Sequence, residues 1–220
     1  MPRTRVKICG VCRPDDARVA ADAGADAVGM VRVDGSPRQV SIDEARAIAA
    51  VLPAFVTPVL LYLEPAADIV RRDLAALGRP AVVQFQGDVP LATIAALEDV
   101  PVITAVRVET DLEPRLQLLR DTPLPNLLGL LVETPGQIGG SGVSNDWNAI
   151  GALIRDGAFA GLPPLIAAGG LTPDTVAGVI AAIRPYAVDV SSGVAESTRR
   201  KSPAKIRAFI ANARAAGDRL

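Results

Sequence analysis

Val6-Lys7-Ile8-Cys9-Gly10 is a short apolar run that ends in a thiol, and Ala187-Val188-Asp189-Val190-Ser191-Ser192-Gly193 is a second that ends in a small, hydroxyl-rich turn. Both runs are continuous rather than alternating, which is typical of parallel strands buried on both faces. If both are strands of one parallel barrel, the thiol of Cys9, the carboxylate of Asp189 and the Ser-Ser-Gly turn lie at carboxyl-terminal strand ends. Such barrels keep their chemistry there.

The same kind of run recurs eight times along the chain. Strands are expected at residues 6–9, 27–31, 57–62, 81–84, 101–106, 127–132, 165–168 and 187–190. Helices are expected between them at residues 14–23, 42–52, 66–77, 91–97, 112–119, 148–159, 173–184 and 203–215. This alternation predicts the α/β class and a single (β/α)8 barrel, a TIM barrel, over residues 1–220. A doubly wound open sheet has strands of the same appearance and is the architectural alternative.

Helix starts carry capping signals. Ser41 precedes an expected helix and Glu44 is its third residue, which is the capping-box pattern. Thr172-Pro173-Asp174 predicts a helix with proline at its first position. The fifth helix is the least regular, because Pro114 and Pro123 interrupt that region.

Composition narrows the functional classes. The chain has 220 residues, of which 50% are hydrophobic and 21% are charged, and this suits one globular domain. A net charge of -1 lacks the basic footprint of a nucleic-acid binder. No apolar stretch has the length of a signal peptide or a membrane span. The sequence therefore predicts a cytoplasmic protein with neither a nucleic-acid nor a membrane partner.

Two cysteines, Cys9 and Cys12, lie three positions apart in a chain without histidine. A zinc site would need carboxylates to complete this soft pair, so no metal site is expected. A redox C-x-x-C pair usually opens a helix, whereas the expected cap around Pro14 lies downstream of both thiols.

Two glycine turns suggest a phosphate site. Gly169-Gly170 follows the seventh expected strand and Ser192-Gly193 follows the eighth, and these are the two strands where barrels usually bind phosphate through backbone N–H groups. The alternative is that these glycines only make tight turns. Asp189 lies within an apolar run, so we expect it to orient backbone or substrate hydroxyl groups.

Seven motifs resemble those of the phosphoribosylanthranilate isomerase family in order and spacing. They are Lys7-Ile8-Cys9-Gly10, residues 24–29 (GADAVG), Ser36-Pro37-Arg38, residues 83–87 (VQFQG), residues 139–142 (GGSG) with Asp146-Trp147, Gly169-Gly170-Leu171, and residues 188–194 (VDVSSGV). The resemblance covers nearly the whole chain. It implies a barrel enzyme of tryptophan biosynthesis that needs no cofactor and performs an Amadori rearrangement on a small phosphorylated sugar.

The resemblance also implies residue roles. Cys9 is then the general base that removes the C2 proton, and Lys7, which alternates onto the same side of the strand, favours the thiolate. Arg38 matches the position that pairs with the anthranilate carboxylate. The alternatives are that Cys9 is a small buried hydrophobe and that Arg38 is a solvated surface residue.

Departures from the family pattern affect the same site. The family's general acid is an aspartate after the sixth strand, where this chain has Glu133 and a loop one residue shorter. Gln86 stands where the family carries histidine, so a titratable group is replaced by an amide at a substrate-binding position. The basic run 199–201 replaces the family's loop after the eighth strand, either to meet an acidic ligand group or as a solvated charge run.

Three functions stay open at this level. The first is the isomerase, with Cys9 as base and Glu133 as acid. The second is a paralogue that rearranges or condenses another phosphorylated sugar, and the third is a non-catalytic barrel that binds a sugar phosphate. The sequence leaves open whether the chain is a monomer or a homodimer, and whether Lys7 reacts covalently as a Schiff base.

Overall fold

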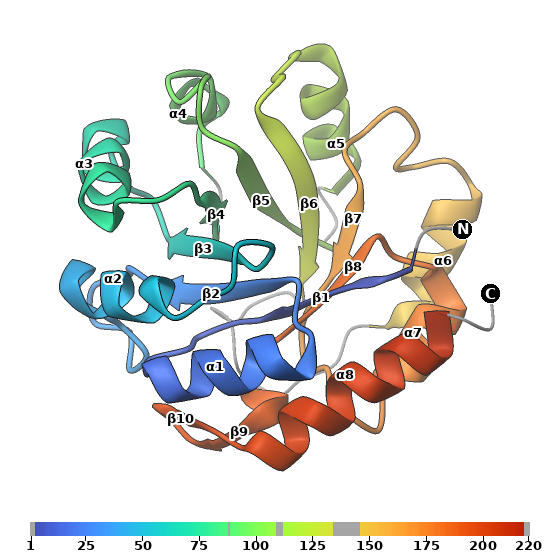
Figure 1. Cartoon of the computed structure of the whole chain (residues 1–220). Coiled ribbons are helices and arrows are strands. Elements are labelled where there is room, and N and C mark those ends of the chain that lie inside the picture. The colour runs from blue at the N-terminus through green and yellow to red at the C-terminus, as the bar shows by residue number, and fades with distance from the viewer. Residues whose placement is uncertain (1–2, 88, 109–111, 134–145, 218–220) are drawn as a thin grey trace.

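Eight parallel strands close into a barrel in the computed structural model of the chain, which describes residues 3–87, 89–108, 112–133 and 146–217. Each strand pairs with the next along the chain, and the eighth pairs with the first. Helices surround the strands on the outside (Figure 1). The closed order confirms the predicted (β/α)8 barrel and excludes a doubly wound open sheet, which would leave two free edges.

The described strands are β1 (Arg5–Ile8), β2 (Ala27–Val31), β3 (Thr57–Tyr62), β4 (Val82–Phe85), β5 (Val102–Arg107), β6 (Leu127–Glu133), β7 (Leu165–Ala167), β8 (Ala187–Val190), β9 (Ala195–Ser197) and β10 (Arg200–Lys201). The described helices are α1 (Pro14–Ala23), α2 (Ile42–Ala50), α3 (Ala67–Leu77), α4 (Leu91–Ala95), α5 (Leu112–Asp121), α6 (Trp147–Arg155), α7 (Val176–Ile183), α8 (Pro203–Gly217) and the short 3-10 helix η1 (Ser192–Val194).

Alternate residues of the strands face two different cores. Outward-facing side chains such as Ile8, Met30 and Phe85 are fully buried against the helices. Side chains on the other face of the sheet point inward. Ala105 and Leu131 are among them, and they belong to a smaller apolar cluster inside the barrel. Burying a large apolar side chain contributes about 1.5–3 kcal/mol, so both layers stabilise the closed sheet.

Helix starts follow the capping signals in one case and depart from them in another. Ser41 and Glu44 form the predicted capping box: Glu44 N–H donates to Ser41 Oγ at 3.0 Å, and Ser41 N–H donates to Glu44 Oε2 at 2.6 Å. The predicted start at Pro173 is wrong, because α7 begins at Val176. Thr172 and Thr175 exchange hydrogen bonds first, and this turn delays the helix.

Proline does not prevent the fifth helix. Pro114 lies in the first turn of α5, where a backbone N–H has no intrahelical partner to lose. The sixth helix is shorter than expected: α6 ends at Arg155, and Gly157 then adopts a φ of 83°. Such a left-handed residue terminates a helix readily.

A small hairpin follows β8 and was not predicted. β9 pairs antiparallel with β10, with Arg200 opposite Ser197. In Figure 1 the hairpin lies beside α1 and the start of α8. Its strands are short and mostly polar, so they leave no apolar alternation that would predict them.

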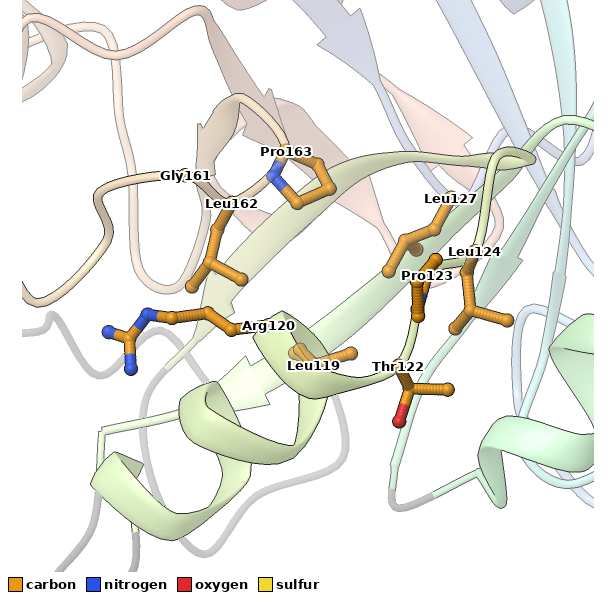
Figure 2. Close-up of a pocket in the computed structure, with 9 residues that line it drawn as sticks. All are labelled: Leu119, Arg120, Thr122, Pro123, Leu124, Leu127, Gly161, Leu162 and Pro163. Atoms are coloured by element: carbon orange, nitrogen blue, oxygen red, sulfur yellow. The ribbon is translucent and has the colours of Figure 1, made fainter.

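A pocket of about 340 Å³ lies at the amino-terminal end of β6 and β7. Figure 2 shows its lining, which comes from the end of α5, the loop before β6 and the loop before β7. This is the end of the barrel opposite the predicted chemistry, where residues usually serve stability. Across the described ranges, no helix is both long and apolar enough to cross a membrane.

Candidate active site

Cys9 lies directly after β1 with its thiol buried. The residue is 5% exposed, and its backbone N–H donates to Val190 O at 2.8 Å, which fixes it beside the end of β8. Gly29 of β2 gives the thiol room: a Cβ there would lie 2.9 Å from Cys9 Sγ and 3.0 Å from Lys7 Nζ. The thiol and the ammonium therefore share one space above Gly29, as the alternation of β1 predicted.

Lys7 forms a buried ion pair with Asp189. Lys7 Nζ donates to Asp189 Oδ1 at 2.8 Å, and both side chains are less than 10% exposed. Burial alone lowers the pKa of Lys7, but its interactions with Asp189 and Cys9 outweigh this effect, so the net pKa is raised. The described partner of Asp189 is thus the Lys7 ammonium, which the sequence did not single out for it.

Arg38 reaches the same end of the barrel from the loop between β2 and α2. A Cβ on Gly10 would lie 2.8 Å from Arg38 Cδ and 2.9 Å from Ser191 Oγ, so the arginine stem passes over Gly10 toward the turn after β8. Gly10 has a φ of 66°, a backbone conformation that residues with a side chain rarely adopt. Arg38 Nε is buried and has no acceptor among the described residues, so this cation is not neutralised through that nitrogen.

Lys201, a member of the basic run 199–201 whose role the sequence left open, is a further cation at the site. Its side chain is buried, and Nζ donates to Ser191 O at 2.9 Å. Burial lowers the pKa of Lys201 to about 8, with Cys9 opposing the shift and Arg38 adding to it. The basic run was the available signal, but a charge run in sequence does not distinguish one buried lysine from its solvated neighbours.

Arg199 and Arg200, the other members of the basic run, contact other residues of the chain. Arg199 Nη1 donates to Gln39 O at 2.6 Å, and Arg199 Nη2 lies 3.3 Å from Glu44 Oε1. Arg200 Nε lies 3.2 Å from Glu196 Oε2. The Arg199 contacts connect the β9–β10 turn to the loop that carries Arg38 and to the first turn of α2.

The two glycine turns meet at the ends of β7 and β8. Gly169 and Gly170 have φ angles of 91° and 64°, so both need glycine. A Cβ on Gly193 would overlap the carbonyl oxygen of Leu171, which shows how closely the second turn packs against the first. Gly169, Gly170, Ser192 and Gly193 donate no backbone hydrogen bond to another described residue.

Gln86 lies directly after β4 and is buried. Its Oε1 accepts a hydrogen bond of 3.1 Å from Gln84 Nε2. Gln84 Oε1 is buried without a partner among the described residues, and no pattern in the sequence singles it out. The two amides therefore form a polar patch at the β4 side of the barrel.

Glu133 is the last residue of β6, and its backbone pairs with Arg107 of β5. This places the residue at a carboxyl-terminal strand end, as expected. Its side chain lies outside the described part of the structure, as do residues 134–145 with the loop to Gly139.

Cys12 forms a hydrogen bond to the loop that carries Arg38. Cys12 Sγ donates to Arg38 O at 3.4 Å and lies 3.8 Å from Gly10 O. Burial raises the pKa of the Cys12 thiol, against the lowering effect of Arg199, Lys201 and Arg38. Both cysteines are free thiols.

These residues define a class: a (β/α)8-barrel protein with a thiol, a buried ion pair and an arginine whose Nε has no acceptor among the described residues, all around the ends of β1 and β8, and two glycine turns at the ends of β7 and β8. The arrangement suits an enzyme that moves protons on a small anionic substrate.

Comparison with known proteins identifies the family within this class. Residues 6–212 match the family described as N-(5'phosphoribosyl)anthranilate (PRA) isomerase. The N-(5'-phosphoribosyl)anthranilate isomerase of Pseudomonas fluorescens is 42% identical over 212 residues, covering 96% of this chain and 95% of that protein. The chain belongs to the phosphoribosylanthranilate isomerase family.

Solved structures agree with this assignment. The phosphoribosyl anthranilate isomerase of Thermotoga maritima superimposes with a TM-score of 0.84 at 35% identity, covering 96% of this chain and 99% of that one. Another structure of a phosphoribosyl anthranilate isomerase, in complex with reduced 1-(o-carboxyphenylamino)-1-deoxyribulose 5-phosphate, gives a TM-score of 0.81 at 32% identity, with coverage of 96% and 99%.

Proposed function

We propose that this chain isomerises N-(5'-phosphoribosyl)anthranilate to the corresponding 1-amino-2-ketose phosphate, the Amadori step of tryptophan biosynthesis. The observation that carries the proposal is the placement of Cys9 against Lys7 at the end of β1, inside a chain of this family. The reaction needs one group that protonates the ring oxygen and another that removes the C2 proton.

Cys9 is the proposed general base. The sugar ring first opens to an iminium, and the thiolate then takes the proton from C2, which gives an enolamine that tautomerises to the ketone. An ammonium beside the sulfur favours the thiolate, and Lys7 is held in that charged form by Asp189. The same charge argues against a Schiff base on Lys7, because only the neutral amine attacks a carbonyl.

Glu133 is the proposed general acid. It lies at the end of β6, whereas Cys9 lies at the end of β1, and three strand pairings separate them around the barrel through β7 and β8. A substrate over the barrel mouth would therefore have one proton-transfer group on each side. A glutamate at a position where the family carries aspartate has one methylene more to reach the ring oxygen.

The phosphate is assigned to the glycine turns after β7 and β8. Gly169, Gly170, Ser192 and Gly193 offer backbone N–H groups without acceptors in the described structure. Glycine allows the main chain to approach an anion closely, and successive N–H groups form a concave anion site. The ligand of the solved relative carries a phosphate, which supports this assignment.

Arg38 is assigned to the carboxylate of the anthranilate ring. Its guanidinium enters the site over Gly10 and matches a carboxylate in geometry and charge. Gln86 is assigned to the substrate as a neutral hydrogen-bonding group. Asp189 contributes to substrate binding through Lys7, whose ammonium it fixes.

One chain is the proposed catalytic unit, acting as one domain over residues 1–220. All the site residues named above come from the same barrel, so activity does not require a second copy to complete the site. Sedimentation analysis shows at which protein concentrations the chain is a monomer or a homodimer. Specific activity measured at the same concentrations then tests whether activity requires a second copy. The cytoplasmic location stays a prediction that cell fractionation would test.

The direct test is turnover of freshly generated phosphoribosylanthranilate by the purified protein, followed by loss of the substrate's fluorescence. Turnover above the uncatalysed rate supports the isomerase. A well-folded protein without turnover would overturn the proposal and direct the search to other phosphorylated sugars.

A further inference from the structure

The loop of residues 32–41 determines where Arg38 points. It leaves β2, carries Arg38 over Gly10, and ends at the cap of α2. Arg38 Nε has no acceptor among the described residues. The direction of the guanidinium therefore depends on how the loop backbone is held.

Three successive carbonyl groups of this loop each accept a hydrogen bond from a side chain, two of them from outside the loop and one from Arg32 at its start. Arg38 O accepts from Cys12 Sγ at 3.4 Å, Gln39 O accepts from Arg199 Nη1 at 2.6 Å, and Val40 O accepts from Arg32 Nη1 at 2.6 Å. The three donors follow β1, β9 and β2. The peptide units at and after Arg38 are thereby fixed from three sides.

Arg32 is itself held by a buried cluster outside the barrel. Arg32 Nε donates to Asp73 Oδ2 at 3.0 Å, and Tyr62 Oη donates to the same oxygen at 3.1 Å. Asp73 belongs to α3 and Tyr62 ends β3, and Figure 1 shows α2 and α3 lying outside β2 and β3. The cluster thus connects the Arg38 loop to the next βα unit.

Each member of the cluster depends on the others. Asp73 is 3% exposed, and a buried carboxylate without donors is costly. Burial, together with the charge of Asp73, raises the pKa of Tyr62, so its hydroxyl stays a donor. The planar fork of Arg32 reaches a carboxylate and a backbone carbonyl at once, which a single ammonium does less well.

We propose that Arg32, held by Asp73 and Tyr62, is a positioning residue that fixes the Val40 end of the loop and so directs Arg38 at the substrate carboxylate. The proposal rests on the proposed function in one respect, since it takes that carboxylate as the partner of Arg38. Arg32 does not touch the substrate. Its effect should therefore appear in KM and require Arg38.

A double-mutant cycle tests this dependence. Arg32→Gln should raise KM about tenfold, the size of one lost charge-assisted contact, and change kcat by less than about twofold. Added to Arg38→Gln, the same substitution should change KM by less than about twofold, because the loop then has no guanidinium to direct. A purely structural role for Arg32 would give the same fold-change in both backgrounds.

Two further variants keep the test sound. Tyr62→Phe removes one donor from Asp73 without a new charge and should raise KM about two- to threefold, even if Arg32→Gln folds poorly. Arg79→Gln is the matched control, because Arg79 is also half-buried and donates to the carbonyls of Ala49 and Leu52, but at the opposite end of α2. It should leave KM unchanged.

The outcomes separate this inference from the function. Absence of turnover in the wild type overturns the function. Wild-type turnover with an unchanged KM in Arg32→Gln and Tyr62→Phe overturns the positioning role alone, as does an Arg32→Gln effect that is equally large without Arg38.

Discussion

Lys7 Nζ lies 2.8 Å from Asp189 Oδ1, and this ion pair connects the first strand of the barrel to the last. The two residues are also direct register partners across β1 and β8. The same contact therefore stabilises the seam that closes the barrel and holds a positive charge beside Cys9. Stability and chemistry at this seam depend on one pair of side chains.

Breaking that pair should destabilise the protein strongly. Lys7→Met leaves Asp189 charged and buried without its partner, which typically costs about 3–5 kcal/mol. Urea denaturation at pH 7 measures the free energy of unfolding. Turnover should fall as well, because Cys9 loses the ammonium that shares the space above Gly29 with its thiol.

A double variant separates the two effects. Lys7→Met combined with Asp189→Leu removes both charges, so most of the lost stability should return while turnover stays low. A double variant as unstable as Lys7→Met would contradict the role of the ion pair. One with wild-type activity would remove Lys7 from the mechanism.

Lys201 should give stability an unusual dependence on pH. Its folded-state pKa of about 8 lies below the ordinary value of 10.5, so the unfolded state binds more protons between these values and stability due to this residue rises with pH. The slope in that window approaches about 1.4 kcal/mol per pH unit. Unfolding at pH 7.5 and 9.5 should therefore show wild type gaining stability relative to Lys201→Met. No relative gain would contradict the depressed pKa.

Gly29 should be required for the arrangement of the thiol and the ammonium. Gly29→Ala places a Cβ within about 3 Å of both Cys9 Sγ and Lys7 Nζ, so one or both must move. A displacement of about 1 Å at a reacting group can lower the rate by roughly 100-fold. Steady-state kinetics should show this loss mainly in kcat, and an unchanged kcat would contradict the shared position above Gly29.

Gly193 should be required for the contact between the two glycine turns. Gly193→Ala would force its Cβ against the Leu171 carbonyl, so we expect weaker binding of inorganic phosphate and a higher KM. Gly178→Ala is the control, because that glycine lies in α7 with no atom within 4 Å of an added Cβ. It should raise stability by about 0.5–1 kcal/mol and leave phosphate affinity unchanged. Equal phosphate affinity in Gly193→Ala would contradict the assigned site.

The fold could be predicted because its signal is local. Continuous apolar runs mark strands buried on both faces, and three strands, including Ala187–Val190, have the predicted bounds. The start of α7 could not be predicted, because the hydrogen bonds between Thr172 and Thr175 compete with the capping that Pro173 suggested. The β9–β10 hairpin has too few residues to show a period.

Only the part of the site that lies in local sequence motifs could be predicted. Cys9 and Arg38 belong to motifs that a family resemblance locates along the chain. The contact of Arg199 with Gln39 joins residues 160 positions apart, and the Arg32–Asp73–Tyr62 cluster joins three elements. No local pattern predicts such contacts, because they depend on how loops pack after the barrel closes.

The roles of Cys9 as base and Glu133 as acid are tested first by the steady-state kcat for phosphoribosylanthranilate in wild type, Cys9→Ala and Glu133→Gln. We expect turnover by wild type and a fall in kcat of about 10²–10⁴-fold in each variant, since each loses one proton-transfer group. Binding of a phosphate-bearing product analogue should stay nearly intact in Cys9→Ala. A folded wild type without turnover, or either variant with the wild-type kcat, would contradict these roles.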